Sequence, residues 1–141
     1  MSAPIRRSVF VGCAAERAFV TFTDRIDAWW PPGHRTLAGS RIGFEADRLV
    51  ERTAEAESEL GRVVAWEPPN LLSYTWRPGA PAGTTTLVVI RFVPDGDGTR
   101  VHVEHGEGAS GLGDAWPTRA ERFDRSWERV LAAFVGWTAA G

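Results

Sequence analysis

The chain has 141 residues, of which 43% are hydrophobic and 24% charged, and its formal net charge is −2. This length suits one domain, expected over residues 1–141, and the composition is too apolar for a disordered chain. No run of about 18 apolar residues is present, so no membrane span is expected. The 16 basic residues are fewer than the 18 acidic ones and do not cluster, which argues against nucleic acid as a partner.

Residue types narrow the chemistry further. The sequence contains arginine but no lysine, which excludes lysine Schiff-base and pyridoxal-phosphate mechanisms. Its only cysteine, Cys13, cannot form an internal disulfide, and the N-terminus lacks a signal-peptide pattern. We therefore expect a cytoplasmic protein. Three histidines without metal-ligand spacing and a lone cysteine predict no metal site, and no cofactor is expected.

The first part of the chain predicts one strand and two helices. Residues 5–11 are rich in β-branched side chains and predict a strand. Residues 14–22 predict a helix with an apolar side. Asp24 is expected to cap a second short helix over 26–30, which ends at the Pro-Pro-Gly turn of residues 31–33.

From residue 35 to residue 107 the pattern changes to strands separated by turns. Pro68-Pro69-Asn70, the loop 78–83 and Asp95-Gly-Asp-Gly98 provide the strongest turn signals. Consecutive strands joined by short turns predict an antiparallel meander. The six expected strands are 35–44, 47–53, 58–66, 71–77, 84–93 and 99–107.

A long final helix is expected to begin at Pro117 or Thr118. Apolar residues recur there at three- and four-residue spacing, and the charged residues lie mostly off this stripe. Only the sheet is large enough to bury the stripe, so we expect a curved antiparallel sheet around the helix with a pocket between them. The stripe consists of Trp116, Phe123, Trp127, Val130, Leu131 and Phe134.

Several segments carry a resemblance to a known family. They are residues 14–19, the Ala28-Trp-Trp30 run, Leu49-Val-Glu-Arg52, residues 61–69, residues 72–76, residues 98–105 and residues 126–131. On these motifs the chain resembles the SRPBCC/START superfamily, with its helix-grip, Bet v 1-like fold. Within it the chain is similar to bacterial single-domain relatives of the activator of the heat-shock-protein-90 ATPase, the AHSA-like family. The resemblance implies an α+β helix-grip fold of about seven strands in the order β-α-α-β6-α with an internal cavity.

The resemblance leaves function open, because the superfamily includes lipid carriers, cyclases, hydrolases and co-chaperone domains. The chain departs from many relatives where His105 is followed by Gly106-Glu107 and not by Gly-Trp. Trp116 is expected to occupy comparable space.

Alternation along the strands turns two polar residues inward. His105 shares a face with Val101 and Val103, opposite a charged set, so it is either an acid/base group or a buried residue bonded to backbone. Glu51 shares a face with Leu49, while Arg48, Val50 and Arg52 are expected outside. Glu51 is then a polar anchor or acid/base group, or it pairs with an arginine at the sheet rim. The family's strand order implies that Glu51 and His105 face each other across the pocket.

Aromatic residues supply the rest of the expected pocket. One of Trp29 and Trp30 should line the pocket and the other pack in the core. The pattern does not decide whether Trp66 faces inward or outward. His34 is expected in solvent. Tyr74 either orients a ligand or packs in the core. The full set of expected ligand-binding residues is Trp29, Trp30, Glu51, Tyr74, Trp76, Ile90, His105, Trp116, Phe123 and Trp127.

Three functions follow from this reading. The favoured one is binding of a small hydrophobic or aromatic ligand in the cavity. The alternative is a cavity-based enzyme of the polyketide cyclase or hydrolase kind, with Glu51 or His105 as acid/base; the sequence does not decide whether turnover occurs. A co-chaperone-type protein-binding module is the third, and a chaperone partner is the least favoured. The sequence leaves a homodimer open.

Overall fold

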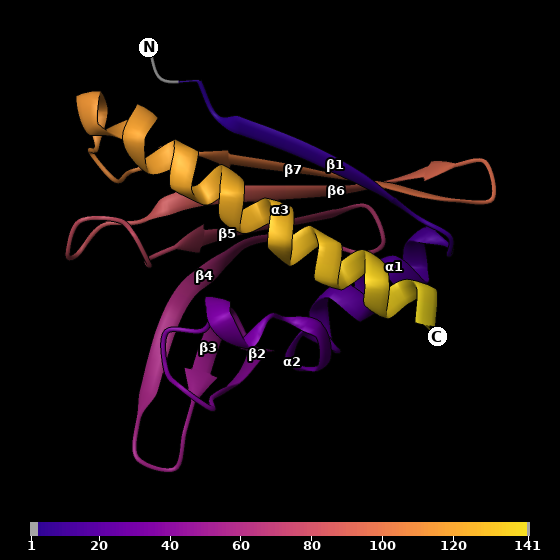
Figure 1. Cartoon of the computed structure of the whole chain (residues 1–141), viewed down its shortest axis with the longest axis horizontal. Helices are drawn as coiled ribbons and strands as arrows, with labels where there is room; N and C mark the ends of the chain where they lie inside the picture. The colour runs from indigo at the N-terminus through magenta and orange to yellow at the C-terminus, as the bar shows by residue number, and fades with distance from the viewer. Residues whose placement is uncertain (1–2, 141) are drawn as a thin grey trace.

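The computed structural model describes residues 3–140 and has the expected α+β architecture, a seven-stranded antiparallel sheet covered by a long C-terminal helix (Figure 1). The strands are β1 (Ile5–Val11), β2 (Arg41–Glu45), β3 (Arg48–Arg52), β4 (Glu57–Glu67), β5 (Leu71–Trp76), β6 (Thr86–Asp95) and β7 (Gly98–Gly106). The helices are α1 (Ala15–Thr23), α2 (Ile26–Trp29) and α3 (Trp116–Ala140), with short 3₁₀ turns η1 (Pro32–His34) and η2 (Gly113–Ala115). Within residues 3–140 no helix is both long and apolar enough to cross a membrane.

The strand order is β1-β7-β6-β5-β4-β3-β2, and every neighbouring pair is antiparallel. Strands β2 to β7 form the predicted meander, and β1 returns to pair with β7, so that Val9 lies opposite Val101. Figure 1 shows α3 running across one face of the sheet, with α1 near its C-terminal end. The helix therefore covers the face onto which the inward side chains point.

The core lies between α1, α3 and the inner face of the sheet. Alternation along β7 is confirmed, because Val101 and Val103 are buried while His102 is exposed. Phe22 of α1 packs edge-on against Phe134 of α3 and Phe92 of β6, with ring centroids 5.4 and 6.1 Å away. Burial of such rings stabilises the fold by about 1.5–3 kcal/mol each.

The loop before β2 corrects one sequence-based expectation. A strand was predicted over residues 35–44, but β2 begins only at Arg41. The guanidinium of Arg35 donates to Asp27 Oδ1 at 2.7 Å and to the carbonyls of Trp30 and Ser40 at 2.9 and 2.6 Å. Side-chain and backbone turn hydrogen bonds, and not a β-ladder, therefore satisfy polar groups of this segment.

Two smaller expectations were also wrong. Asp24 does not cap the second helix; it ends α1, donating its backbone N–H to the carbonyl of Val20, and the residue before α2 is Arg25. Val50 was expected outside, yet it is buried. The register of β3 shifts between Leu49 and Val50, and such a bulge breaks the alternation of side chains.

Strand β4 bends strongly in Figure 1, and Gly61 lies within it. A Cβ atom at Gly61 would lie 1.7 Å from the carbonyl oxygen of Thr75 in β5. Only glycine allows the two backbones to approach this closely. The close packing of β4 against β5 at this point thus depends on a missing side chain.

We predict that Gly61→Ala destabilises the protein by about 1–3 kcal/mol or more, because the added methyl group must displace backbone. Gly43→Ala in β2 is the matched control, since nothing lies within 4 Å of a Cβ at that position. Urea unfolding followed by circular dichroism measures both. Equal midpoints for the two variants would contradict the role assigned to Gly61.

Candidate functional site

A cavity of about 440 Å³ opens between α3, the end of β5 and the segment that follows α2. This volume suits a small organic ligand. The lining combines aromatic rings with polar and positively charged side chains. It consists of Trp30, Gly33, His34, Arg35, Trp76, Pro78, Gly79, His105, Arg119, Arg122, Phe123, Ser126, Trp127, Arg129 and Val130.

Three tryptophans from three elements meet in this lining. The ring of Trp30 lies 6.0 Å from that of Trp76 and 6.3 Å from that of Trp127, centroid to centroid. The indole N–H of Trp30 donates to the carbonyl of His34 at 3.2 Å, which fixes the ring beside the opening. These rings offer a large apolar area with defined orientation.

His105 joins the sheet to the helix at the base of this pocket. The indole N–H of Trp127 donates to Nδ1 of His105 at 2.9 Å, and the hydroxyl of Thr86 lies 2.7 Å from Nε2. An indole nitrogen can only donate, so Nδ1 is the acceptor and Nε2 carries the proton that is donated to Thr86. The imidazole also stacks on Phe123, with centroids 4.1 Å apart.

The hydrogen bonds leave His105 no free nitrogen for a substrate. Burial lowers the pKa of its imidazole from 6.5 to about 3, so the ring is neutral near pH 7. It is 1% exposed. Of the two roles expected for His105, the geometry matches a buried structural residue, although its partners are side chains and not backbone.

Glu51 has a comparable structural task away from the pocket lining. Its carboxylate accepts hydrogen bonds from the backbone N–H groups of Thr36 and Leu37, both at 2.9 Å, and from the Thr36 hydroxyl at 2.8 Å. It is 1% exposed and pairs with no arginine of residues 3–140. Glu51 is therefore a polar anchor for the loop before β2, and it does not face His105 across the cavity.

Five of the ten expected ligand-binding residues line the cavity: Trp30, Trp76, His105, Phe123 and Trp127. The other five lie elsewhere: Trp29, Glu51, Tyr74, Ile90 and Trp116. The choice between the paired tryptophans is thus resolved, since Trp29 is in the core and donates its indole N–H to the carbonyl of Thr21 at 2.8 Å.

The other expected residues that do not line the cavity are buried in the core. Ile90 is fully buried in the sheet face, and Tyr74 is buried with a hydroxyl that has no partner among the residues described. The ring of Trp116 lies 6.2 Å from that of His105, and its indole N–H donates to the carbonyl of Ala3 at 2.8 Å. Trp66, left undecided, is 42% exposed and packs edge-on against Phe19 at 5.3 Å.

Sequence analysis missed the polar lining. His34 was expected in solvent but is half-buried on the cavity wall, where burial and the charge of Arg129 lower the pKa of its imidazole. Arg119, Arg122 and Arg129 belong to the charged residues expected mostly off the apolar stripe, yet all three line the cavity. Their spacing of three and seven residues places them on one face beside the apolar stripe, a signal that the sequence does contain.

Two alternatives are weaker on geometric grounds. A second hollow of about 340 Å³ lies over β1, β6 and β7, but its lining contains no Phe, Tyr or Trp. Within residues 3–140, no three His, Cys, Asp or Glu side chains come together as a metal site would require. The aromatic cavity under α3 is the candidate site.

An antiparallel sheet that holds a C-terminal helix over an aromatic pocket defines a helix-grip domain of the SRPBCC type. Residues 13–137 match the family described as "Activator of Hsp90 ATPase homolog 1-like protein", and the chain belongs to this family. A search of the curated proteins found no match.

Solved structures share the fold. The anthrahydroquino-gamma-pyrone synthase Txn09 is 27% identical, with 95% of this chain and 96% of that one covered and a TM-score of 0.59. A protein from Rhodobacter sphaeroides is 19% identical, with 98% and 93% covered and a TM-score of 0.70. Protein NE0264 from Nitrosomonas europaea is 14% identical, with 95% and 92% covered and a TM-score of 0.66.

We predict that His105→Gln flattens the pH dependence of stability. The folded state holds His105 neutral, whereas the unfolded chain binds a proton below pH 6.5, so the contribution is complete above pH 6.5 and is lost as the pH falls toward 3. This group adds a slope of up to about 1.4 kcal/mol per pH unit, which the variant lacks. Urea unfolding between these pH values measures it. His102→Gln, on the exposed face of β7, is the control and should keep the wild-type slope.

We also predict that Glu51→Gln destabilises the protein by about 1.5–3 kcal/mol, because an amide group then faces N–H donors that need an acceptor. Glu55→Gln, on an exposed turn, should change the free energy of unfolding by less than about 0.5 kcal/mol. Thermal and urea unfolding report the difference. A Glu51→Gln variant as stable as Glu55→Gln would show that the loop does not depend on this carboxylate.

Proposed function

We propose that the protein binds a small aromatic molecule in the cavity under α3. The observation that carries the proposal is the convergence of Trp30, Trp76 and Trp127 on one open cavity of about 440 Å³. A protein gains little stability from leaving such rings around an unfilled space, whereas an aromatic ligand stacks on them favourably. The similarity to Txn09, whose name is that of a synthase of a fused aromatic product, supports the same class of ligand.

A second candidate is turnover of that ligand, which the likeness to a synthase favours. Glu51 and His105 are both occupied by protein hydrogen bonds, so neither is a good acid/base group. His34 is the better one, because it lines the cavity and its buried Nδ1 has no hydrogen-bond partner among residues 3–140. A time-dependent change in ligand absorbance with wild type, absent with His34→Gln, would support turnover; a static change in both supports binding alone.

The third function considered, docking of a protein partner, has less support. The large exposed apolar side chains are distributed over β1, α1, β4, β6 and α3. They are Phe10, Val20, Val64, Trp66, Val93 and Trp137. The family description concerns activation of Hsp90, and a pull-down with a bacterial homologue of that chaperone would test it for this chain.

We predict that neutral N-phenylnaphthylamine binds the wild-type protein with an increase in its fluorescence, and that Trp76→Ala weakens this binding at least about tenfold. The loss reflects the apolar and stacking contact of one large ring. Trp137→Ala removes an equally large, 43% exposed ring near the end of α3 and should leave the affinity unchanged. Equal affinity in both variants, or no binding to wild type, would refute the proposal.

A further inference from the structure

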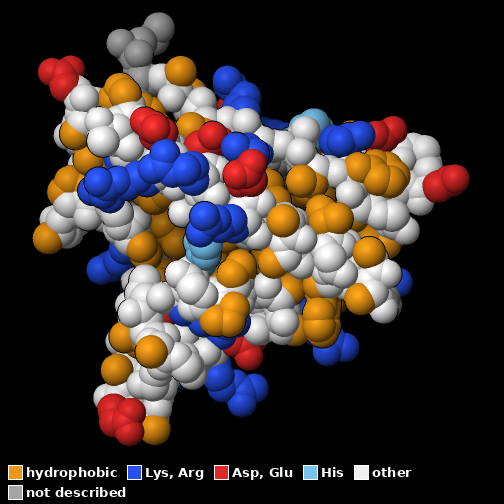
Figure 2. All heavy atoms as spheres, viewed as in Figure 1, with side chains coloured by type: hydrophobic (Ala, Val, Ile, Leu, Met, Phe, Trp, Pro, Cys, Tyr) orange, Lys and Arg blue, Asp and Glu red, His pale blue; other side chains and the backbone are white. Residues whose placement is uncertain are grey.

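The mouth of the cavity carries three arginines without acidic partners. Arg119, Arg122 and Arg129 line the cavity, and within residues 3–140 none of them forms a salt bridge or a side-chain hydrogen bond. Figure 2 shows arginine side chains gathered over the N-terminal half of α3, beside a hollow with an apolar floor. Three uncompensated guanidinium groups at one opening repel each other, which an anion between them would relieve.

The acidic residues of α3 are committed elsewhere. Asp124 receives two hydrogen bonds from Arg7 of β1, at 2.8 and 3.1 Å, and Glu128 lies 3.7 Å from the same guanidinium. Glu121 pairs with Arg125, one turn away. None of the fifteen lining residues of the cavity is Asp or Glu. The charge at the mouth therefore has no counterpart in the lining.

Two polar atoms on the same wall lack partners. Nδ1 of His34 and Nε of Arg35 are buried and form no hydrogen bond with any residue from 3 to 140. The Arg35 side chain is only 10% exposed, and its other nitrogens bond to Asp27, Trp30 and Ser40. Buried polar atoms are normally satisfied, so two orphans on one cavity wall point to a polar group supplied from outside the chain.

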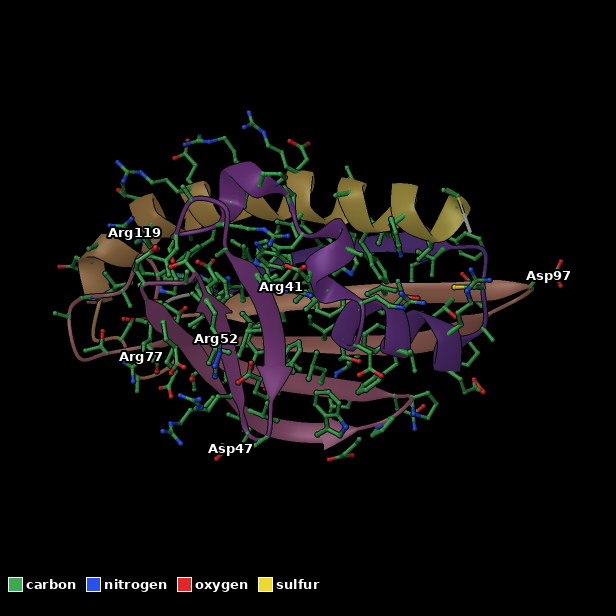
Figure 3. The ribbon with its side chains drawn as sticks, turned by 90° about the horizontal axis from the view of Figure 1, so that it is seen from below. Arg41, Asp47, Arg52, Arg77, Asp97 and Arg119 are labelled. Carbon is green, nitrogen blue, oxygen red and sulfur yellow. The ribbon has the colours of Figure 1, made fainter. Side chains whose placement is uncertain are left out.

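The loop that follows β5 holds one arginine against the opening. Gly79 has a φ of +83°, and a Cβ there would lie 3.0 Å from Phe123 and 3.4 Å from Cδ of Arg119. The stem of Arg119 therefore packs between this loop and the aromatic floor. Figure 3 places Arg119 at the end of the molecule where Arg77 follows β5. The residue is half-buried, and charge interactions are stronger there than in open solvent.

We infer that the ligand of this pocket is an anion: an aromatic ring system that bears a carboxylate or another oxyanion, with the rings on the tryptophans and the anionic group among Arg119, Arg122 and Arg129. The inference rests on the proposed function and deepens it. Aromatic cages alone also bind quaternary ammonium groups, but a lining that contains arginines and no Asp or Glu disfavours them. Guanidinium groups match the planar geometry of a carboxylate.

The test compares two probes of similar ring size, neutral N-phenylnaphthylamine and anionic anilinonaphthalene sulfonate. Wild type should bind the anionic probe at least about tenfold more tightly at low salt, and salt should reduce this preference. Arg122→Gln and Arg129→Gln, alone and together, should remove the preference stepwise, because each weakens binding of the anionic probe more than binding of the neutral one. Because both side chains are exposed, neither change should impair folding.

Arg91→Gln is the control for overall charge. Arg91 is exposed on β6, outside the aromatic cavity, and its loss changes the net charge equally. If both probes bind with equal affinity, or if Arg91→Gln weakens the anionic probe as much as Arg122→Gln does, the anion inference is wrong while the proposed function stands. If neither probe binds, the proposed function itself fails.

Discussion

The hydrogen bond from Trp127 to His105 is the contact on which the site depends. It joins helix α3 to strand β7, and the same imidazole stacks on Phe123, which lies one helical turn before Trp127. An imidazolium could not accept this bond, so the contact requires the neutral ring that burial enforces. Since Trp127 also forms part of the cavity wall, the interaction that fixes the helix on the sheet fixes the aromatic lining as well.

Glu51 makes the corresponding contact at the other side of the site. By accepting three donors from Thr36 and Leu37 it orders the chain directly after His34 and Arg35, which are part of the cavity wall. Both inward polar residues therefore have their hydrogen-bonding capacity used by the protein. Groups satisfied in this way rigidify a site, as the proposed binding of a ligand in a preformed pocket requires.

The fold could be predicted from the sequence, but only five of the ten expected ligand-binding residues line the cavity. The difference arises because sequence patterns report local structure. Alternation along a strand decides which way a side chain points, so it placed His105 and Glu51 inside. Alternation does not reveal the hydrogen-bond partners of a buried side chain, because these partners come from segments distant in sequence. Trp127 is 22 residues away from His105, and Thr36 is 15 residues away from Glu51. The bulge beside Val50 and the side-chain bonds of Arg35 are likewise tertiary features that overrode the strand pattern.

The arginines of α3 show a different limit. Between the apolar and the polar face of an amphipathic helix lie residues at the edge of the apolar stripe. Where the apolar face is not fully packed against the sheet, these edge residues border the space that remains. Arg119, Arg122 and Arg129 occupy that boundary, where the curved sheet leaves a cavity and no carboxylate reaches. A net charge of −2 hides this arrangement, because no Asp or Glu belongs to the cavity lining and several are paired elsewhere, as Asp124 is with Arg7. The local charge at the mouth, and not the net charge of the chain, is therefore the quantity on which the proposed anion selectivity depends.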